Sequence, residues 1–175
     1  MKIERKWAMS NKWTFMIKPI KELLEEEMGT GLFIKGLWLD PFAGKYSPAQ
    51  ITNDLNSKMP TRYHLDALVF LKQQKDNSVD GILFDPPYSP RQIQECYQNI
   101  GTPLTGRETK ASFWSDIKNE IARIVKVGGK AICFGWNSVG IGKKRSFELK
   151  RILLVSHGGI KNDTICTVEI KIKND

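Results

Sequence analysis

The sequence has 175 residues, of which 41% are hydrophobic, so it can build the core of a folded domain and intrinsic disorder is not the default. Its 27 basic and 19 acidic side chains give a net charge of +8, which favours a polyanionic partner without identifying one. The cysteines Cys96, Cys133 and Cys166 show no metal-binding spacing, so we expect free thiols, a reducing compartment and no metal. Without a signal peptide or a bilayer-spanning run, the sequence predicts a cytoplasmic protein with no membrane partner and one domain over residues 1–175.

Apolar periodicity and turn residues predict a chain of alternating strands and helices. In chain order we expect a helix over 19–28, strands over 34–39 and 50–53, a third strand near Tyr63, a helix over 67–72 with Asp66 as its N-cap, a strand over 79–84, helices over 91–98 and 112–125, and strands over 130–136, 149–156 and 164–171. The rest of the polar segment 89–111 is expected to form a mobile loop. A short turn at Gly158-Gly159 requires the last two strands to be antiparallel. The pattern therefore predicts an α/β fold with a mostly parallel sheet and an antiparallel hairpin at the C-terminus.

Two of the predicted strands end in an aspartate followed by proline. The first continues as the segment 40–44 (DPFAG), and the second continues as the segment 85–88 (DPPY). A single Asp-Pro pair is a common turn starter, but two such pairs at strand ends of one sheet are much less expected by chance. Because open α/β sheets bind ligands at the carboxyl ends of their strands, these two segments are the candidate site.

The segment 85–88 carries the more specific chemical signal. Two consecutive prolines fix the backbone and remove two amide donors. The Asp85 carboxylate and the Pro86 carbonyl can then accept the two protons of an exocyclic amino group, and the Tyr88 ring can stack on a planar base. Accepting both protons draws the nitrogen lone pair out of conjugation and directs it at an electrophile.

This order of motifs resembles the amino-methyltransferases of DNA, whose fourth motif is (D/N/S)PP(Y/F/W). The segment 12–28 (KWTFMIKPIKELLEEEM) looks like motif ten of that family, 40–44 looks like motif I, and Asp66-Ala67 looks like motif III. Asp54 stands where the family has an acidic residue for the ribose hydroxyls. The resemblance covers nearly the whole chain and implies a Rossmann-like class I methyltransferase fold with a seven-stranded sheet. It departs from the family at 42–46 (FAGKY), where FxGxG is frequent and only Gly44 is present.

The resemblance implies S-adenosyl-L-methionine as cofactor and assigns roles to individual residues. The implied catalytic residues are Asp85, Pro86, Pro87 and Tyr88. The implied cofactor-binding residues are Phe15, Lys18, Asp40, Pro41, Phe42, Ala43, Gly44, Asp54, Asp66 and Ala67. The expected nucleic-acid contacts are Arg91, Arg107, Lys110, Lys143, Lys144 and Arg145, although a solvated face is the more ordinary explanation for the basic run that begins at Lys143. Trp114 and Trp136 are expected in the core, and Phe15 either there or against the cofactor.

The leading function is methyl transfer to N6 of adenine in DNA, either at defined sites or with relaxed specificity. Cytosine N4, adenine in RNA and a non-catalytic nucleic-acid-binding subunit remain alternatives, as does another kind of nucleotide-binding α/β protein. In the family, glutamine modification goes with Asn at the first position of the fourth motif, so Asp85 argues against it. Family members that read a sequence carry a separate recognition domain, for which this chain has no room. We therefore expect weak selectivity, a homodimer, or a partner subunit that supplies recognition.

Overall fold

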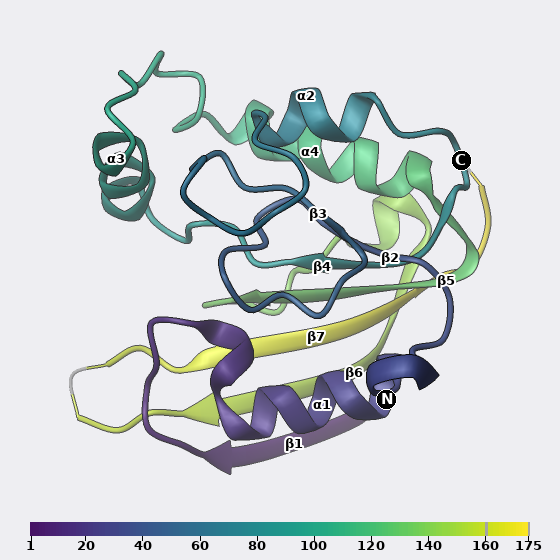
Figure 1. The fold of residues 1–175 in the computed structure, drawn as a ribbon. Helices are drawn as coiled ribbons and strands as arrows, with labels where there is room; N and C mark the ends of the chain where they lie inside the picture. The colour runs from purple at the N-terminus through teal and green to yellow at the C-terminus, as the bar shows by residue number, and fades with distance from the viewer. Residues whose placement is uncertain (160, 175) are drawn as a thin grey trace.

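The computed structural model describes residues 1–159 and 161–174. Within them, one mixed sheet has the strand order β1-β6-β7-β5-β4-β2-β3 (Figure 1). The strands are β1 Lys2–Trp7, β2 Trp38–Asp40, β3 Ile51–Thr52, β4 Val79–Phe84, β5 Val125–Gly135, β6 Phe147–Ser156 and β7 Thr164–Lys171. β7 is antiparallel to both of its neighbours, and every other pair is parallel. The predicted mostly parallel sheet with an antiparallel C-terminal hairpin is therefore confirmed.

Helices cover both faces of the sheet (Figure 1). Helix α1, Lys18–Met28, lies on one face, and α2, Ala67–Lys72, lies with α4, Ala111–Ile124, on the other. Helix α3, Pro90–Asn99, stands apart from both layers, and short 3-10 helices occur at η1 Thr14–Met16, η2 Gly31–Phe33 and η3 Lys143–Arg145. Asp66 begins α2 as predicted, because its carboxylate accepts the amides of Leu68 and Val69.

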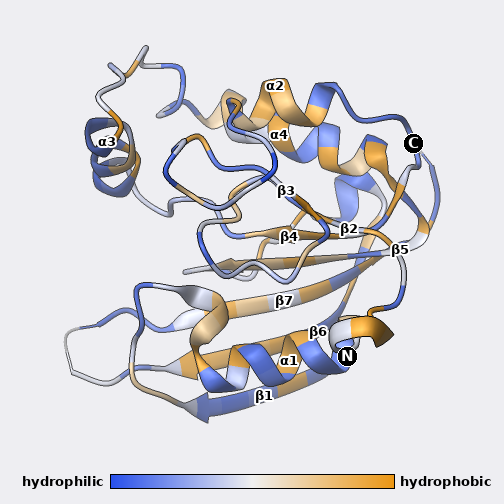
Figure 2. Ribbon diagram, in the orientation of Figure 1, coloured by the Kyte–Doolittle hydropathy of each residue, from blue (hydrophilic) through white to orange (hydrophobic). Residues whose placement is uncertain are grey.

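Side chains of the central strands alternate between two apolar cores, as the period of two requires. Hydrophobic colour covers much of β4 and β5 in the ribbon (Figure 2). On β4, Ile82 and Phe84 pack toward α2 and α4, whereas Leu83 packs toward α1. On β5, Cys133 and Ile132 divide in the same way. Burial on both faces explains why these strands are nearly continuous apolar runs in the sequence.

Several elements differ from the predictions, and the third strand expected near Tyr63 is only an isolated bridge to Asn53. Strand β1 was not predicted, because its charged residues alternate with exposed apolar ones and show no buried face. The strand expected over 34–39 begins only at Trp38, since η2 and a glycine turn at Gly36 precede it. Helix α4 ends at Ile124 and β5 begins at once at Val125, so the glycines at 128–129 lie within the strand instead of ending the helix.

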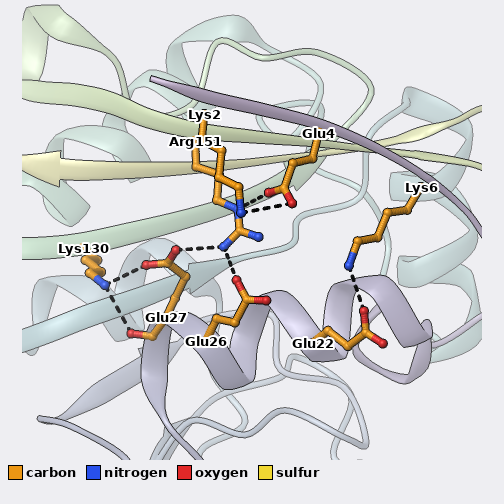
Figure 3. Close-up of polar contacts among 8 residues, drawn as sticks. All are labelled: Lys2, Glu4, Lys6, Glu22, Glu26, Glu27, Lys130 and Arg151. Atoms are coloured by element: carbon orange, nitrogen blue, oxygen red, sulfur yellow. Dashed lines mark hydrogen bonds and ion pairs between the residues drawn. The ribbon is translucent and has the colours of Figure 1, made fainter.

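A buried guanidinium holds the N-terminal strand and α1 to the rest of the sheet (Figure 3). Arg151 on β6 is 8% exposed and donates to Glu4 on β1 at 2.7 Å and to Glu26 on α1 at 2.6 Å. Its third partner, Glu27 at 3.2 Å, also pairs with Lys130 of β5 at 2.7 Å. Four elements therefore share one charge network, and β1 is held by more than its backbone ladder.

Among the described residues, no helix is both long and apolar enough to cross a bilayer. The three cysteines are free, with Cys133 and Cys166 buried and Cys96 exposed, as the sequence predicts for unpaired thiols. Within the same residues, no group of three or more His, Cys, Asp or Glu side chains is arranged to hold a metal ion.

Candidate active site

A cavity of about 570 Å³ opens at the carboxyl ends of β2 and β4. We call it the large cavity. Its walls come from the segments that follow β2, β3 and β4, from α3, from the start of α4, and from residues 12–14, where η1 begins. Of the predicted site residues, Pro41, Phe42, Asp54, Asp66, Ala67, Asp85, Pro86, Pro87 and Tyr88 line it. The structure therefore brings the two strand-end segments together, as their positions in the sequence predicted.

The segment 85–88 forms a turn with its polar atoms already engaged. The Tyr88 hydroxyl donates to the Asp85 carboxylate, and the Tyr88 amide donates to Gln92 Oε1 at 2.7 Å. Burial raises the pKa of Asp85, while hydroxyls from Thr14 and Tyr88 act in the opposite direction. Burial and the neighbouring Asp85 charge raise the pKa of Tyr88, so its phenol stays a neutral donor. The turn thus presents a carboxylate that hydroxyl donors can reach and an aromatic ring beside it.

Asp40 supports the first strand-end segment through buried hydrogen bonds and does not line the large cavity. It is fully buried, and its carboxylate accepts Ser47 Oγ at 2.6 Å and the Phe42 amide at 2.9 Å. Burial raises the pKa of Asp40 to about 8, and the nearby Asp85 and Asp54 add to the increase. Asp40 therefore shapes the turn that positions Phe42.

Gly44 completes the turn after β2. Its φ of +56° lies in the left-handed region that favours glycine, and its amide donates to Asp54 Oδ2 at 3.0 Å. Gly44 and the buried Ala43 lie behind the cavity wall, so the backbone of 43–44 supports the site without lining it. The single glycine of the motif thus fixes Asp54 by a main-chain hydrogen bond.

Two carboxylates face the large cavity beyond Phe42. Asp54 accepts amides from Gly44 and, at 2.8 Å, from Asn56, and burial raises its pKa. Asp66 caps α2 and also accepts Arg107 Nη2 at 3.0 Å. Both carboxylates keep lone pairs that can accept hydroxyl groups, as a ribose would require.

Besides Asp40, Ala43 and Gly44, two further predicted cofactor residues do not line the large cavity. Phe15 is 7% exposed and packs edge-on against Phe134, with ring centroids 5.3 Å apart, so it belongs to the core under α1. Lys18 is exposed at the first position of α1. Lys12, Trp13 and Thr14, from the same segment, line the cavity in their place.

A second cavity of about 280 Å³ lies on the other side of the same turn. We call it the small cavity. It shares Pro86, Pro87, Tyr88 and Trp114 with the large one, and Lys118 and Trp136 complete much of its wall. The expectation that Trp136 is core is wrong. It is 43% exposed, and its ring lies 5.6 Å from the Tyr88 ring. Trp114 packs on the core but also lines both cavities, with its indole N–H donating to the Glu108 carbonyl at 3.0 Å.

The basic residues after the 85–88 turn lie near the large cavity but differ in whether a carboxylate already pairs with them. Arg91 is exposed and pairs with Glu95 along α3, and Lys110 is exposed just before α4. Arg107 is held by Asp66 and lies over the Phe113 ring at 4.9 Å. Arg107 does not line the cavity itself, and its guanidinium is held against two residues that do, Asp66 and Phe113.

The cluster Lys143, Lys144 and Arg145 lies at the opposite end of the strands from the 85–88 turn. It precedes β6, whose first residue Phe147 pairs with Lys171, whereas Gly135 at the carboxyl end of β5 pairs with Ile165. The six residue steps between those β7 positions span roughly 20 Å. Arg145 also donates to Ser115 and Asn119 of α4. The structure thus does not bring this cluster to the 85–88 turn.

Several cavity residues carried no recognisable signal in the sequence. Thr14, Gln92 and Glu108 belong to segments that read as a helix approach, a short helix and a loop. Lys118 reads as an ordinary charged position of an amphipathic helix. Only the fold places these side chains next to the two strand-end segments, so motif spacing could not reveal them.

The sheet order, its antiparallel last strands and the cavity at the strand ends are those of the Rossmann-like methyltransferase fold. No protein-family model matches the sequence, and no curated protein sequence matches it.

Solved structures share this fold at low sequence identity. TrmN from Thermus thermophilus is 16% identical with a TM-score of 0.57, over 90% of this chain and 49% of that one. The 1,6-didemethyltoxoflavin-N1-methyltransferase of Burkholderia thailandensis, solved with S-adenosylhomocysteine, is 10% identical with a TM-score of 0.59, over 89% and 78%. NSun6 from Pyrococcus horikoshii is 11% identical with a TM-score of 0.52, over 80% and 49%. The chain spans about half the length of TrmN and NSun6, and these likenesses establish its fold.

Proposed function

We propose that the protein is an S-adenosyl-L-methionine-dependent methyltransferase that modifies the N6 amino group of adenine in DNA. The observation that carries the proposal is the Asp85 carboxylate beside the Tyr88 ring, on a double-proline turn that separates the large cavity from the small one. A carboxylate, a backbone carbonyl and an aromatic ring on one turn suit a planar base with an exocyclic amino group.

The side chains of the large cavity fit the cofactor. Asp54 and Asp66 offer carboxylate acceptors for ribose hydroxyls, and Phe42, Leu65 and Ala67 offer apolar surface for an adenine ring. The Burkholderia thailandensis enzyme of the same fold holds S-adenosylhomocysteine, which supports the choice of cofactor. When bound, this cofactor supplies an electrophilic methyl group on a sulfonium.

In the proposed reaction, the target base leaves the duplex and enters the small cavity, where Tyr88 stacks on it. Asp85 and the Pro86 carbonyl accept the two amino protons and so aim the nitrogen lone pair at the methyl carbon. The nitrogen forms the new N–C bond as the C–S bond breaks, and the electron pair of that bond stays on sulfur. The methylated nitrogen then releases one proton, for which Asp85 is the nearest acceptor. Burial raises the pKa of Asp85, and this makes it a better proton acceptor than an exposed carboxylate.

Nucleic-acid contacts are proposed on two surfaces. Arg91 and Lys110, exposed beside the large cavity, are placed to meet phosphates near the flipped base. Lys143 and Lys144 are exposed at the opposite end of the strands and fit a more distant stretch of backbone. A second copy of the chain or a recognition subunit is the proposed source of sequence selectivity.

The experiment is tritium transfer from labelled S-adenosylmethionine to single- and double-stranded DNA, followed by digestion to nucleosides. Label in N6-methyldeoxyadenosine is the expected result. Label in N4-methyldeoxycytidine would support methyl transfer to an exocyclic amino group but overturn adenine as the target base. Transfer to RNA alone would overturn DNA as the substrate, and no transfer to any nucleic acid with cofactor bound would overturn the proposed activity.

A further inference from the structure

An ammonium group with unused donors lines the small cavity. Lys118 projects from α4 between Trp114 and the segment that follows β5. Among the described residues, its one hydrogen-bond partner is the Gly140 carbonyl, at 2.6 Å, and no carboxylate lies within ion-pair distance of it. An ammonium has three N–H donors, so two remain for a ligand.

The surroundings of Lys118 make this arrangement costly unless something binds there. Burial lowers the pKa of Lys118, and the aromatic rings of the cavity cannot accept its protons as strong partners. Glu169, a carboxylate that acts on Lys118 through its charge, accepts the amides of Ile141 at 2.6 Å and Gly142 at 3.1 Å. Because the Glu169 carboxylate already accepts two backbone amides, we infer that a bound ligand supplies the further acceptor for the partly buried Lys118 ammonium.

Lys118 and Asp85 stand on opposite sides of the double-proline turn. Asp85 lines only the large cavity, Lys118 lines only the small one, and the residues 86–88 line both. A base whose amino group reaches Asp85 therefore presents the opposite edge of its ring toward Lys118. This step rests on the proposed function, which puts the base in the small cavity.

We propose that Lys118 donates a hydrogen bond to the ring nitrogen opposite the amino-bearing carbon and thereby selects adenine. In adenine, that position is N3, an acceptor. In cytosine, the position opposite the amino-bearing carbon is N1, which carries the sugar, and in guanine it is a carbon. Adenine is the one amino-bearing DNA base with an acceptor nitrogen there, so Lys118 is a specificity-determining residue.

The test measures equilibrium binding of adenosine, 3-deazaadenosine and 7-deazaadenosine with S-adenosylhomocysteine present, using the indole N–H signals of Trp114 and Trp136. We expect 3-deazaadenosine to bind the native protein about tenfold or more weakly than adenosine, because a hydrogen bond to a charged group is lost. 7-Deazaadenosine should bind within about twofold of adenosine, since its altered edge does not face Lys118.

In Lys118→Met, adenosine and 3-deazaadenosine should bind equally, whereas Lys118→Arg and the control Lys72→Met, an exposed lysine on α2, should keep the difference. A purely structural Lys118, which only holds Gly140, would weaken all three nucleosides alike in Lys118→Met and leave their ratio unchanged. That result overturns the inference, as does equal binding of adenosine and 3-deazaadenosine to the native protein. The deaza comparison in the native protein decides the matter even where Lys118→Met does not fold.

Failure of the inference and failure of the proposed function have different signatures. Methyl transfer to adenine together with equal binding of adenosine and 3-deazaadenosine would overturn only the role proposed for Lys118. If Lys118 discriminates adenosine from 3-deazaadenosine but no methyl group is transferred to any nucleic acid, the proposed enzyme activity is overturned and the role of Lys118 in binding is kept.

Discussion

Replacing Arg151 by methionine should destabilise the protein strongly, because three carboxylates would lose their shared partner (Figure 3). The Arg151 side chain is 8% exposed, and Glu4 and Glu27 are 22% and 18% exposed, so these two contacts are poorly screened by water. Glu26 is 54% exposed, and its contact adds little. Removing one partner of a buried ion pair costs about 3–5 kcal/mol, and the partial exposure here places the expected loss near 3 kcal/mol.

Urea unfolding of Arg151→Met and of the native protein at pH 7 measures this loss. The matched control is Lys6→Met, which removes a pair with Glu22 in which both side chains are 39% exposed, and it should cost less than about 1 kcal/mol. Although burial acts in the opposite direction, hydrogen bonds from Lys2 and Arg151 lower the pKa of Glu4. A carboxyl with a lowered folded pKa contributes its full stabilisation above the unfolded pKa and loses it as the pH falls through the folded pKa. The cost of Arg151→Met should therefore shrink as the pH falls below about 4.5.

A loss below about 1 kcal/mol for Arg151→Met, or equal losses for Arg151→Met and Lys6→Met, would refute the reasoning. Either result would mean that the buried Arg151 network contributes no more to stability than an exposed ion pair does.

Burial raises the pKa of Asp40 to about 8, so the folded protein keeps a proton that the unfolded chain loses above about pH 4. The contribution of this group to stability therefore falls as the pH rises from 5 to 8. Over that range, the unfolding free energy of Asp40→Asn should rise by roughly 2–4 kcal/mol relative to that of the native protein. Urea unfolding at the two pH values measures this difference, and the same pH dependence in both proteins would contradict it. Tyr88→Phe keeps the ring and should lower the rate of methyl transfer less than about tenfold, whereas Tyr88→Ala should lower it roughly 10–100-fold, because base stacking is lost; equal rates for the two variants would exclude stacking. Gly140 has a φ of +58°, and a Cβ there would lie 2.1 Å from Glu169 Oε2, so Gly140→Ala should cost about 2 kcal/mol or more in thermal unfolding. Gly106→Ala, where φ is +79° but no atom lies within 4 Å, is the control that isolates backbone strain, and an equal cost for both would rule out the clash.

The sequence predicted those parts of the site that depend on local chemistry. Asp66 was found as an N-cap because capping is decided within one turn of helix. Asp85 and Phe42 were found because strands of a parallel sheet deliver their carboxyl ends to one edge. These inferences needed only the position of each residue relative to its own strand or helix.

What the sequence did not predict depends on contacts between distant elements. Strand β1 has no buried face of its own, and it is held through Arg151, which is 147 positions away from Glu4. Trp136 looked like a core residue because its run is apolar, yet it lies beyond the end of β5, at the Tyr88 ring. Lys118 has the ordinary pattern of a helix surface, and only the packing of α4 beside the 85–88 turn gives it a cavity.

The rate of methyl transfer to DNA by Asp85→Ala, set beside the affinity of the same variant for S-adenosylhomocysteine, tests the proposed role of the Asp85 carboxylate. The control is Asp116→Ala, an exposed carboxylate on α4. We expect Asp85→Ala to lose methyl transfer by about a hundredfold or more and to bind S-adenosylhomocysteine within about threefold of the native protein. We expect Asp116→Ala to be unchanged in both. Transfer by Asp85→Ala at the native rate would contradict the assignment of this carboxylate as the group that holds the amino nitrogen.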